Sequence, residues 1–183
     1  MNTLAAHPPE VTLDLLREEH ASVLFQLVDQ SRAHLRRWLP WVDANRSVAD
    51  TETFLREVIA QHRAGKGPQY AVYWRSELCG VCGFHTFDLT TRCGSVGYWL
   101  GARYCGLGLM TAAIRQLVEV GFGEYRLERI EIACATQNLK SRAIPERLGF
   151  YYEGVVQNRE YVDGRYVDHA IYSLLAQETP MTE

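Results

Sequence analysis

The stretch Tyr98-Trp-Leu-Gly-Ala-Arg-Tyr-Cys105-Gly106-Leu-Gly108-Leu-Met-Thr111 joins an apolar run to a helical pattern through a loop with two glycines. Free backbone N–H groups converge where such a loop opens into a helix, and they favour negative charge there. Gly106 and Gly108 have no Cβ, so their backbone can approach a ligand closely. The stretch therefore predicts a phosphate site, with the helix beginning at Thr111.

Three other interpretations of this loop compete with a phosphate site of this kind. A P-loop needs Gly-Lys-Ser/Thr after its first glycine, and Leu109-Met110-Thr111 does not supply it. A dinucleotide fingerprint would place a third glycine where Thr111 stands and would lie in the first βα unit, whereas this loop comes past mid-chain. A loop that merely connects strand to helix is the third alternative, and the glycines alone leave it open.

Composition and charge restrict the class of protein. The 183 residues are 47% hydrophobic and 22% charged, which is typical of one globular domain. The net charge of −3 argues against nucleic acid or an anionic membrane as the main partner. No apolar run approaches the roughly twenty residues that span a bilayer, and residues 1–10 lack the basic start and apolar core of a signal peptide. We expect a cytoplasmic protein.

The five cysteines do not form a metal-site pattern. Cys79 and Cys82 have the spacing of a redox or zinc pair, but they lie in a strand-like run, where side chains three residues apart point to opposite faces. No second Cys/His pair completes a site. We therefore expect no bound metal.

The hydrophobic pattern predicts one series of elements without internal repeats. Ser47 and Asp50 resemble a capping box at the start of a helix, and Asp163-Gly164 is a hairpin turn signal. We expect strands at 11–15, 70–74, 78–87, 95–100, 129–135, 151–162 and 165–175, and helices at 18–31, after 47, from 111 to 121–123, and at 138–149. The prediction is a single domain over 1–183, with frayed tails at 1–10 and 176–183.

This order, with the glycine loop between the fourth strand and the third helix, resembles the GNAT N-acetyltransferase fold. The family loop pattern Arg/Gln-x-x-Gly-x-Gly/Ala falls on Cys105 to Met110, keeping Gly108 and the common glycine at Gly106. Cys105 and Met110 depart from the outer positions, which puts side-chain contacts there in doubt but not the backbone amides. A second family segment matches Asn138-Leu-Lys-Ser141 followed by Leu-Gly149-Phe150.

Within that family, further segments resemble the bacterial Rim-type enzymes, which acetylate the N-terminal amine of ribosomal proteins. They are Trp38-Leu-Pro-Trp41, Gly97-Tyr98-Trp99-Leu100, Arg147-Leu-Gly-Phe150 and Asp168-His169-x-x-Tyr172. The resemblance covers residues 10–175 and bears more strongly on the fold than on the acceptor, because many relatives act on other amines.

The resemblance implies an α/β (α+β) fold: a mixed, mostly antiparallel sheet of about seven strands with about four helices. Its fourth and fifth strands splay apart to admit acetyl-CoA as co-substrate. The pyrophosphate would lie on the amides of Leu107 to Thr111, and the pantetheine arm would add itself beside Trp99 and Leu100 like a short strand. The cofactor-binding residues expected on this basis are Trp99, Leu100, Cys105, Gly106, Leu107, Gly108, Leu109, Met110, Thr111, Cys134 and Asn138.

Amine acetylation needs a base for the amine and an acid for the departing thiolate. Glu160 is the expected base, because related Rim-type enzymes carry an acid in the matching place. The alternative is that Glu160 is a cross-strand partner of an arginine such as Arg165. Many relatives use a tyrosine seven residues after the motif asparagine as the acid, but Pro145 stands there. Ser141 is the expected replacement, with helix N-cap as an alternative or additional role.

Four further side chains are candidates at the substrate end of the cleft. Trp38, Trp41 and Tyr98 are expected to bind the acceptor, although the two tryptophans could equally pad the core. Cys134, at the end of the fifth strand, is expected near the bound thiol and could form a mixed disulfide with CoA. Cys105 is the other candidate for such an adduct, and Asp168 and His169 are expected to fix the hairpin.

The function expected is an acetyl-CoA-dependent N-acetyltransferase that acts by direct transfer in a ternary complex. The acceptor expected is the N-terminal α-amine of a protein, with a ribosomal protein leading. One alternative is a small-molecule amine acetyltransferase acting on an antibiotic, polyamine or amino acid. The other is a non-catalytic module that senses acetyl-CoA. A homodimer is plausible because the edge of the long C-terminal hairpin needs covering.

Overall fold

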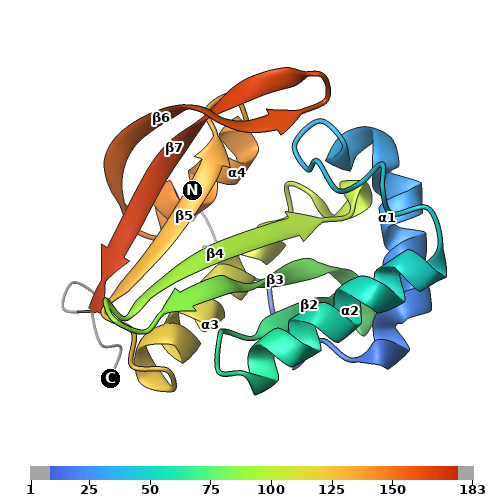
Figure 1. The fold of residues 1–183 in the computed structure, drawn as a ribbon, viewed down its shortest axis with the longest axis horizontal. Coiled ribbons are helices and arrows are strands. Elements are labelled where there is room, and N and C mark those ends of the chain that lie inside the picture. The colour runs from blue at the N-terminus through green and yellow to red at the C-terminus, as the bar shows by residue number, and fades with distance from the viewer. Residues whose placement is uncertain (1–8, 177–183) are drawn as a thin grey trace, which may run out of the picture.

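A computed structural model describes residues 9–176, whose seven strands form one sheet in the order β1-β2-β3-β4-β5-β7-β6 (Figure 1). The strands are β1 (Thr12–Leu15), β2 (Gln69–Trp74), β3 (Glu77–Asp88), β4 (Cys93–Leu100), β5 (Arg129–Ala135), β6 (Tyr151–Val162) and β7 (Arg165–Leu175). The helices are α1 (Ala21–Leu35), α2 (Val48–Arg63), α3 (Leu109–Gly123) and α4 (Leu139–Arg147), with short 3-10 helices η1 (Glu18–His20) and η2 (Ala102–Tyr104). The tails expected to fray lie almost entirely outside the described residues.

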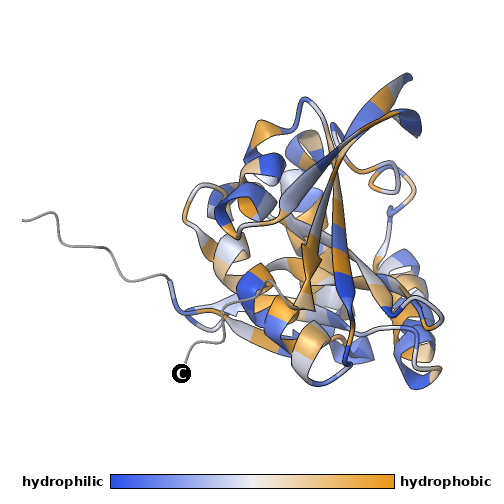
Figure 2. Ribbon diagram, turned by 90° about the vertical axis from the view of Figure 1, so that its left-hand side faces the viewer, coloured by the Kyte–Doolittle hydropathy of each residue, from blue (hydrophilic) through white to orange (hydrophobic). Residues whose placement is uncertain are grey.

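The mixed sheet with helices on both faces confirms the predicted fold. β4 and β5 pair in parallel, whereas the other neighbouring strands pair antiparallel. In Figure 1, α1 and α2 cover one face of the sheet and α3 and α4 cover the other. Hydrophobic residues concentrate along the central strands (Figure 2), where Phe84 and Ile132 are fully buried, as is Ile114 of α3, which packs on them. Each such side chain contributes about 1.5–3 kcal/mol of burial free energy.

The parallel pair β4 and β5 separates halfway along its length. Ladder pairs run from Cys93 with Arg129 to Val96 with Ile132 and stop there. β4 nevertheless continues to Leu100, which pairs with Gly80 of β3, and β5 continues to Ala135, which pairs with His169 of β7. Each strand is thus held along its outer edge while its inner edge is left unpaired, and the two diverge visibly in Figure 1. The predicted splay is confirmed.

The helix cap and the hairpin turn predicted from the sequence both form as expected. The Ser47 hydroxyl accepts the Asp50 N–H at 3.3 Å, and the Asp50 carboxylate accepts the Ser47 N–H at 2.8 Å, which completes the capping box of α2. Asp163 and Gly164 have φ of 49° and 78°, the left-handed values that a tight hairpin turn requires.

The start of α3 differs from the prediction. The helix begins at Leu109 rather than Thr111, because Gly108 adopts a left-handed φ of 77° and serves as the N-cap. Leu109 and Met110 are both buried, so packing against the core extends the helix two residues before the predicted start at Thr111.

β6 forms an edge of the sheet and exposes large hydrophobic side chains. Tyr151, Val155, Val156 and Tyr161 are all more than two-fifths exposed. A long apolar edge is a surface that proteins usually cover. Dimerisation through this hairpin stays a prediction.

Two sequence expectations concern absences. Across residues 9–176, no helix is long and apolar enough to cross a membrane. No group of three His, Cys, Asp or Glu side chains in the same range is arranged to hold a metal ion. Cys79 and Cys82 are both buried within β3.

Alanine at two glycines should have opposite effects on stability. A Cβ at Gly80 would lie 2.2 Å from the Trp99 carbonyl oxygen and 3.0 Å from the Leu100 Cα, so Gly80→Ala must push β3 from β4. We expect the free energy of unfolding to fall by about 2 kcal/mol. Gly123→Ala, with nothing within 4 Å, should raise it by about 0.5 kcal/mol. Urea unfolding followed by circular dichroism measures both, and equal effects would contradict the close approach of the strands.

Candidate functional site

The loop between β4 and α3 presents a row of unsatisfied backbone amides. Gly106 and Gly108 have φ of 82° and 77°, and the first bond into α3 runs from the Ala112 N–H to the Gly108 carbonyl at 3.1 Å. The N–H groups of residues 106–111 have no acceptor among the described residues. These amides and the helix dipole make an anion-binding concavity. The Leu109 and Met110 side chains are buried, so only their backbone can face a ligand there.

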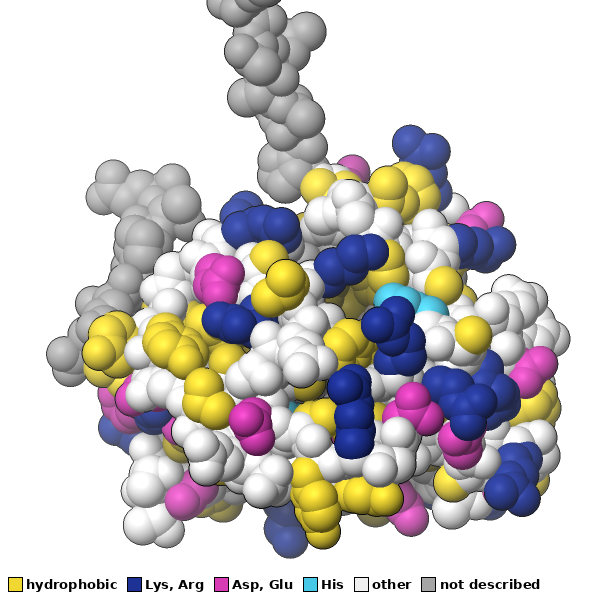
Figure 3. Space-filling view, turned by 90° about the horizontal axis from the view of Figure 1, so that it is seen from above, with side chains coloured by type: hydrophobic (Ala, Val, Ile, Leu, Met, Phe, Trp, Pro, Cys, Tyr) yellow, Lys and Arg dark blue, Asp and Glu magenta, His cyan; other side chains and the backbone are white. Residues whose placement is uncertain are grey.

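Cys105 lies beside this loop and contacts α1 rather than facing solvent. Its Sγ is 3.4 Å from His34 Nε2. Burial raises the pKa of the Cys105 thiol, and the positive charge of Lys140 opposes this shift. The pKa of His34 is lowered, mainly by burial and to a smaller extent by the positive charges of Lys140 and Arg37. Both groups are therefore neutral near pH 7. Lys140 and Arg37 bring positive charge to this end. Figure 3 shows several Lys and Arg side chains on the face seen from above.

On the α4 side of the gap, Tyr98, Cys134 and Ser141 form one hydrogen-bonded cluster. The Ser141 hydroxyl lies 3.3 Å from both the Tyr98 hydroxyl and Cys134 Sγ, and the Tyr98 hydroxyl donates to the Ser141 carbonyl at 3.0 Å. Pro145 has no N–H to offer that carbonyl within α4, which leaves it free for Tyr98. Burial raises the pKa of Tyr98 well above its usual range and also raises the pKa of Cys134. All three groups are neutral near pH 7.

The N-cap role considered for Ser141 is wrong. Asn138 caps α4, and its side-chain oxygen accepts the Ser141 N–H at 3.3 Å. Pro145 accordingly lies inside the helix rather than in its first turn. Because Asn138 meets the capping need, the Ser141 hydroxyl is available to the Tyr98 and Cys134 cluster.

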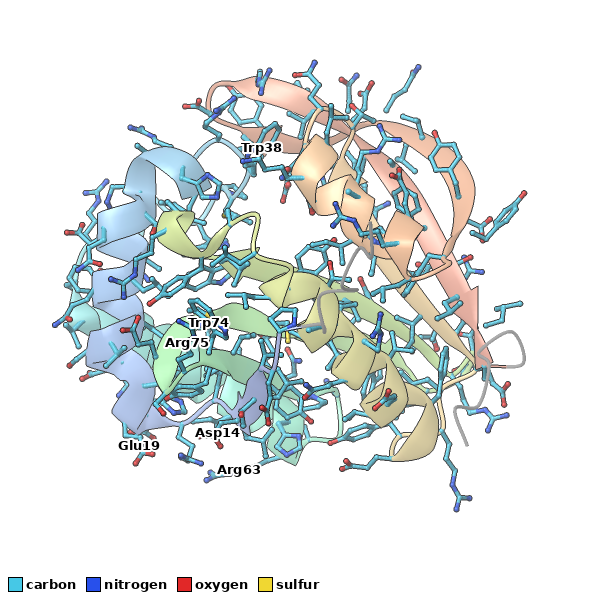
Figure 4. The ribbon with its side chains drawn as sticks, turned by 180° about the vertical axis from the view of Figure 1, so that it is seen from behind. Asp14, Glu19, Trp38, Arg63, Trp74 and Arg75 are labelled. Atoms are coloured by element: carbon cyan, nitrogen blue, oxygen red, sulfur yellow. The ribbon has the colours of Figure 1, made fainter. Side chains whose placement is uncertain are left out.

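Three tryptophans lie on the opposite, α1 side of the sheet. Trp41, 37% exposed, packs on Trp99 with ring centroids 5.9 Å apart. Trp38 packs against Ala135, Val162 and Val167, beneath the hairpin (Figure 4). It also lines a cavity of about 290 Å³ whose polar lining includes Gln137, Asn158, Arg165 and Asp168. The tryptophans thus share in both core packing and the lining of a pocket, and Tyr98, predicted with them, lies on the other side.

Glu160 of β6 also lies on the α1 side of the sheet, just after a bulge in its strand. The β6–β7 register shifts between Val156 and Glu160, and Asn158 takes a left-handed φ of 50° while its N–H bonds the Asp168 carboxylate at 2.8 Å. Asp168 therefore fixes the hairpin as predicted. The alternative partner for Glu160 was wrong: Arg165 donates to Gln137 at 3.3 Å, whereas Glu160 Oε2 lies 3.4 Å from His169 Nε2.

His85 is a site residue that sequence reasoning missed. It projects from β3 across β4, so that a Cβ on Gly97 would lie 1.9 Å from its Nε2. The His85 side chain is accessible to solvent, but the surrounding protein displaces part of its hydration, which lowers its pKa. The negative charge of Glu160 opposes this shift. A single histidine in a strand offers no signal in the sequence, because its neighbour Glu160 is far away along the chain.

Together these parts define a class of protein. The amide-lined loop suits a pyrophosphate, the unpaired inner edges of β4 and β5 suit an extended amide-bearing arm, and the gap separates a neutral hydroxyl–thiol cluster from a carboxylate. Such an arrangement fits an enzyme that uses an acyl-CoA and transfers the acyl group across the gap.

Comparisons with known proteins place the chain within that class. The acetyltransferase (GNAT) domain family matches residues 10–151. The chain is 36% identical over 170 residues to YdaF of Bacillus subtilis (strain 168), covering 92% of each. It is 26% identical over 161 residues to the ribosomal-protein-serine acetyltransferase of Escherichia coli (strain K12), covering 88% of this chain and 90% of that protein.

Two solved structures superpose closely. RimL, a ribosomal L7/L12 α-N-protein acetyltransferase in complex with coenzyme A as a cysteine disulfide, gives a TM-score of 0.87 at 27% identity, covering 90% of this chain and 93% of that one. The microcin C7 self-immunity acetyltransferase MccE, in complex with acetyl-CoA and AMP, gives 0.85 at 28% identity, covering 91% and 92%. The chain belongs to the GNAT family of acetyltransferases. It is an N-acetyltransferase, and acetyl-CoA is its co-substrate.

CoA disulfide should modify Cys134. Attack of the Cys134 thiolate on one sulfur of CoA disulfide forms the protein–CoA disulfide and releases one CoA thiolate. Because burial raises the pKa of Cys134, adduct formation should be slow at pH 7 and accelerate as the pH rises toward 9. Intact mass spectrometry measures the adduct, which Cys134→Ala should abolish. An adduct that survives in Cys134→Ala and disappears in Cys105→Ala would show that the thiol end of CoA lies elsewhere.

Proposed function

We propose that this enzyme acetylates the N-terminal α-amine of a protein in the cytoplasm, with a ribosomal protein as acceptor. The observation that carries the proposal is the Glu160 carboxylate on the α1 side of the gap, opposite the cluster of Tyr98, Cys134 and Ser141. A base on one side and hydroxyl donors on the other suit direct transfer from thioester to amine. The relatives named as ribosomal-protein acetyltransferases support the choice of acceptor.

The chemistry of such a transfer assigns each group one task. An α-amine titrates near 8, so it arrives largely as ammonium at pH 7 and must lose a proton before it attacks. Glu160 takes that proton directly or through one water. Acetyl-CoA supplies the activated acetyl group, whose carbon forms the new C–N bond as the C–S bond breaks. A backbone N–H near Leu100 would stabilise the oxyanion, and the Ser141 hydroxyl would donate a proton to the departing thiolate and regain one from water.

The cavity beside Trp38 would receive the acceptor chain beyond its first residue. It lies against the end of β5 and the hairpin, where Asn158 and Asp168 also line it. Polar side chains form most of its lining beside the indole, Ala135 and Val167, which suits the peptide groups of an acceptor chain. Trp41 and Trp99 would form the neighbouring wall.

A small-molecule amine is the second candidate acceptor. MccE, of similar fold, is described in complex with AMP as well as acetyl-CoA. The exposed indole of Trp41 and the cavity of about 290 Å³ could hold a compact acceptor in the same place.

Release of CoA thiol against a panel of acceptors tests the proposal. The panel contains peptides beginning with Ser, Ala or Met, polyamines, and an aminoglycoside. We expect turnover on peptides only, and a fall in kcat/KM of at least about 100-fold in Glu160→Gln, because the ammonium then loses its proton acceptor. Glu119→Gln, an exposed change in the second half of α3, serves as the matched control and should be silent.

Other outcomes separate the alternatives. Turnover confined to small amines would move the enzyme to the second candidate. Full activity of Glu160→Gln on peptides would retain the acceptor and remove Glu160 as the base. Binding of CoA without turnover on any amine would contradict an enzymatic role and favour a sensor of acetyl-CoA.

A further inference from the structure

Glu160 lies beside a histidine that the proposed mechanism does not use. His169 Nε2 on β7 lies 3.4 Å from Glu160 Oε2 on β6. The His169 side chain is 12% exposed and the Glu160 side chain 36%, so the contact is partly shielded from water. Such shielding strengthens an interaction between a ring N–H and a carboxylate.

The second ring nitrogen of His169 indicates which nitrogen carries the proton. Nδ1 is buried and has no hydrogen-bond partner among the described residues. A buried N–H without an acceptor is costly, whereas a bare lone pair on Nδ1 is a smaller loss. Neutral His169 is therefore most stable with its hydrogen on Nε2, directed at Glu160.

We propose that His169 is a positioning residue for the base: when the acceptor binds, the 3.4 Å contact closes to a hydrogen bond from its Nε2–H to Glu160 Oε2, which leaves Oε1 for the acceptor amine. The inference rests on the proposed function, in which Glu160 accepts the amine proton. One oxygen is then fixed to β7 and the other reserved for the substrate. The bulge that Asp168 stabilises at Asn158 brings Glu160 over β7 and makes this contact possible.

Position 169 also links the base to the gap itself. Its backbone pairs with Ala135 at the end of β5, on the edge opposite the unpaired one. The position of the Glu160 carboxylate therefore depends, through His169, on β5, the strand that borders the gap. His85 on β3 faces the same carboxylate from the other half of the sheet, but its ring is solvent-accessible and makes no hydrogen bond to Glu160 within the described residues.

Two isosteric changes at position 169 separate positioning from packing. The amide nitrogen of Gln falls near the place of Nε2, and that of Asn near Nδ1, so only His169→Gln keeps the donor. We expect His169→Asn to lower kcat about tenfold, the effect of losing a hydrogen bond to a charged group, with the KM for acetyl-CoA unchanged. His169→Gln should stay within about threefold of the parent.

The same changes made in Glu160→Gln complete a double-mutant cycle. If His169 acts through Glu160, His169→Asn should cause no further loss in that background. A similar loss with and without Glu160, or equal losses in the Asn and Gln variants, would overturn the proposal and leave His169 as packing. Thermal unfolding of each variant shows whether any loss reflects the fold.

A measurement without turnover keeps this inference separate from the proposed function. ¹⁵N NMR of histidine-labelled protein reports the tautomer of His169, with its signals assigned by their absence in His169→Gln. We expect the Nε2–H tautomer in the parent and a changed population in Glu160→Gln. An Nδ1–H tautomer would overturn the inference even if peptides are acetylated. The expected tautomer together with no turnover on any amine would leave the contact established but remove the base role, and with it the assignment of His169 as a positioning residue.

Discussion

The separation of β4 from β5 is the constraint on which the rest of the structure depends. Beyond Val96 and Ile132, each strand keeps its outer partner and loses its inner one. Unpaired backbone N–H and C=O groups must be satisfied by water or by a ligand. A gap lined by two such edges is suited to an extended chain that carries amides of its own, and the amide-lined loop at its end is suited to phosphate.

The split sheet also keeps two groups of polar side chains apart. Tyr98 fills the α4 side of the gap, and with Ser141 and Cys134 it forms a neutral cluster in which burial raises the pKa values of the phenol and the thiol. Glu160 stands on the α1 side with two imidazoles facing it. In the proposed mechanism, the amine loses its proton on one side while the thiolate departs on the other.

Much of the fold could be predicted because its signals are local. The strand at Arg129–Ala135 and the hairpin around Asp163-Gly164 follow from alternation and turn chemistry, and both form as expected. The start of α3 was misplaced because burial of Leu109 and Met110, which is a tertiary effect, extends the helix two residues before Thr111. The cap role considered for Ser141 was wrong because Asn138 takes it, and spacing alone does not rank the two residues.

The site could be predicted only where a family motif covers it. The motifs located the glycine loop and Ser141, but not the partners that surround them. The alternative considered for Glu160 was a pairing with an arginine, because charge complementarity on adjacent strands is all that the sequence offers. The bulge at Asn158 instead brings Glu160 beside His169. His85 belongs to the candidate site because it lies near Glu160, which is on a strand far away along the chain, and no sequence pattern encodes that proximity.

The most direct test of the split sheet as the binding site is a crystal structure of the enzyme with CoA. The account predicts pyrophosphate oxygens within hydrogen-bond distance of the amides at 107–111 and the pantetheine arm paired with the inner edge of β4 over 97–100. It also predicts the thiol beside Cys134. A pyrophosphate held by side chains elsewhere, or an arm that leaves the gap between β4 and β5 empty, would contradict it.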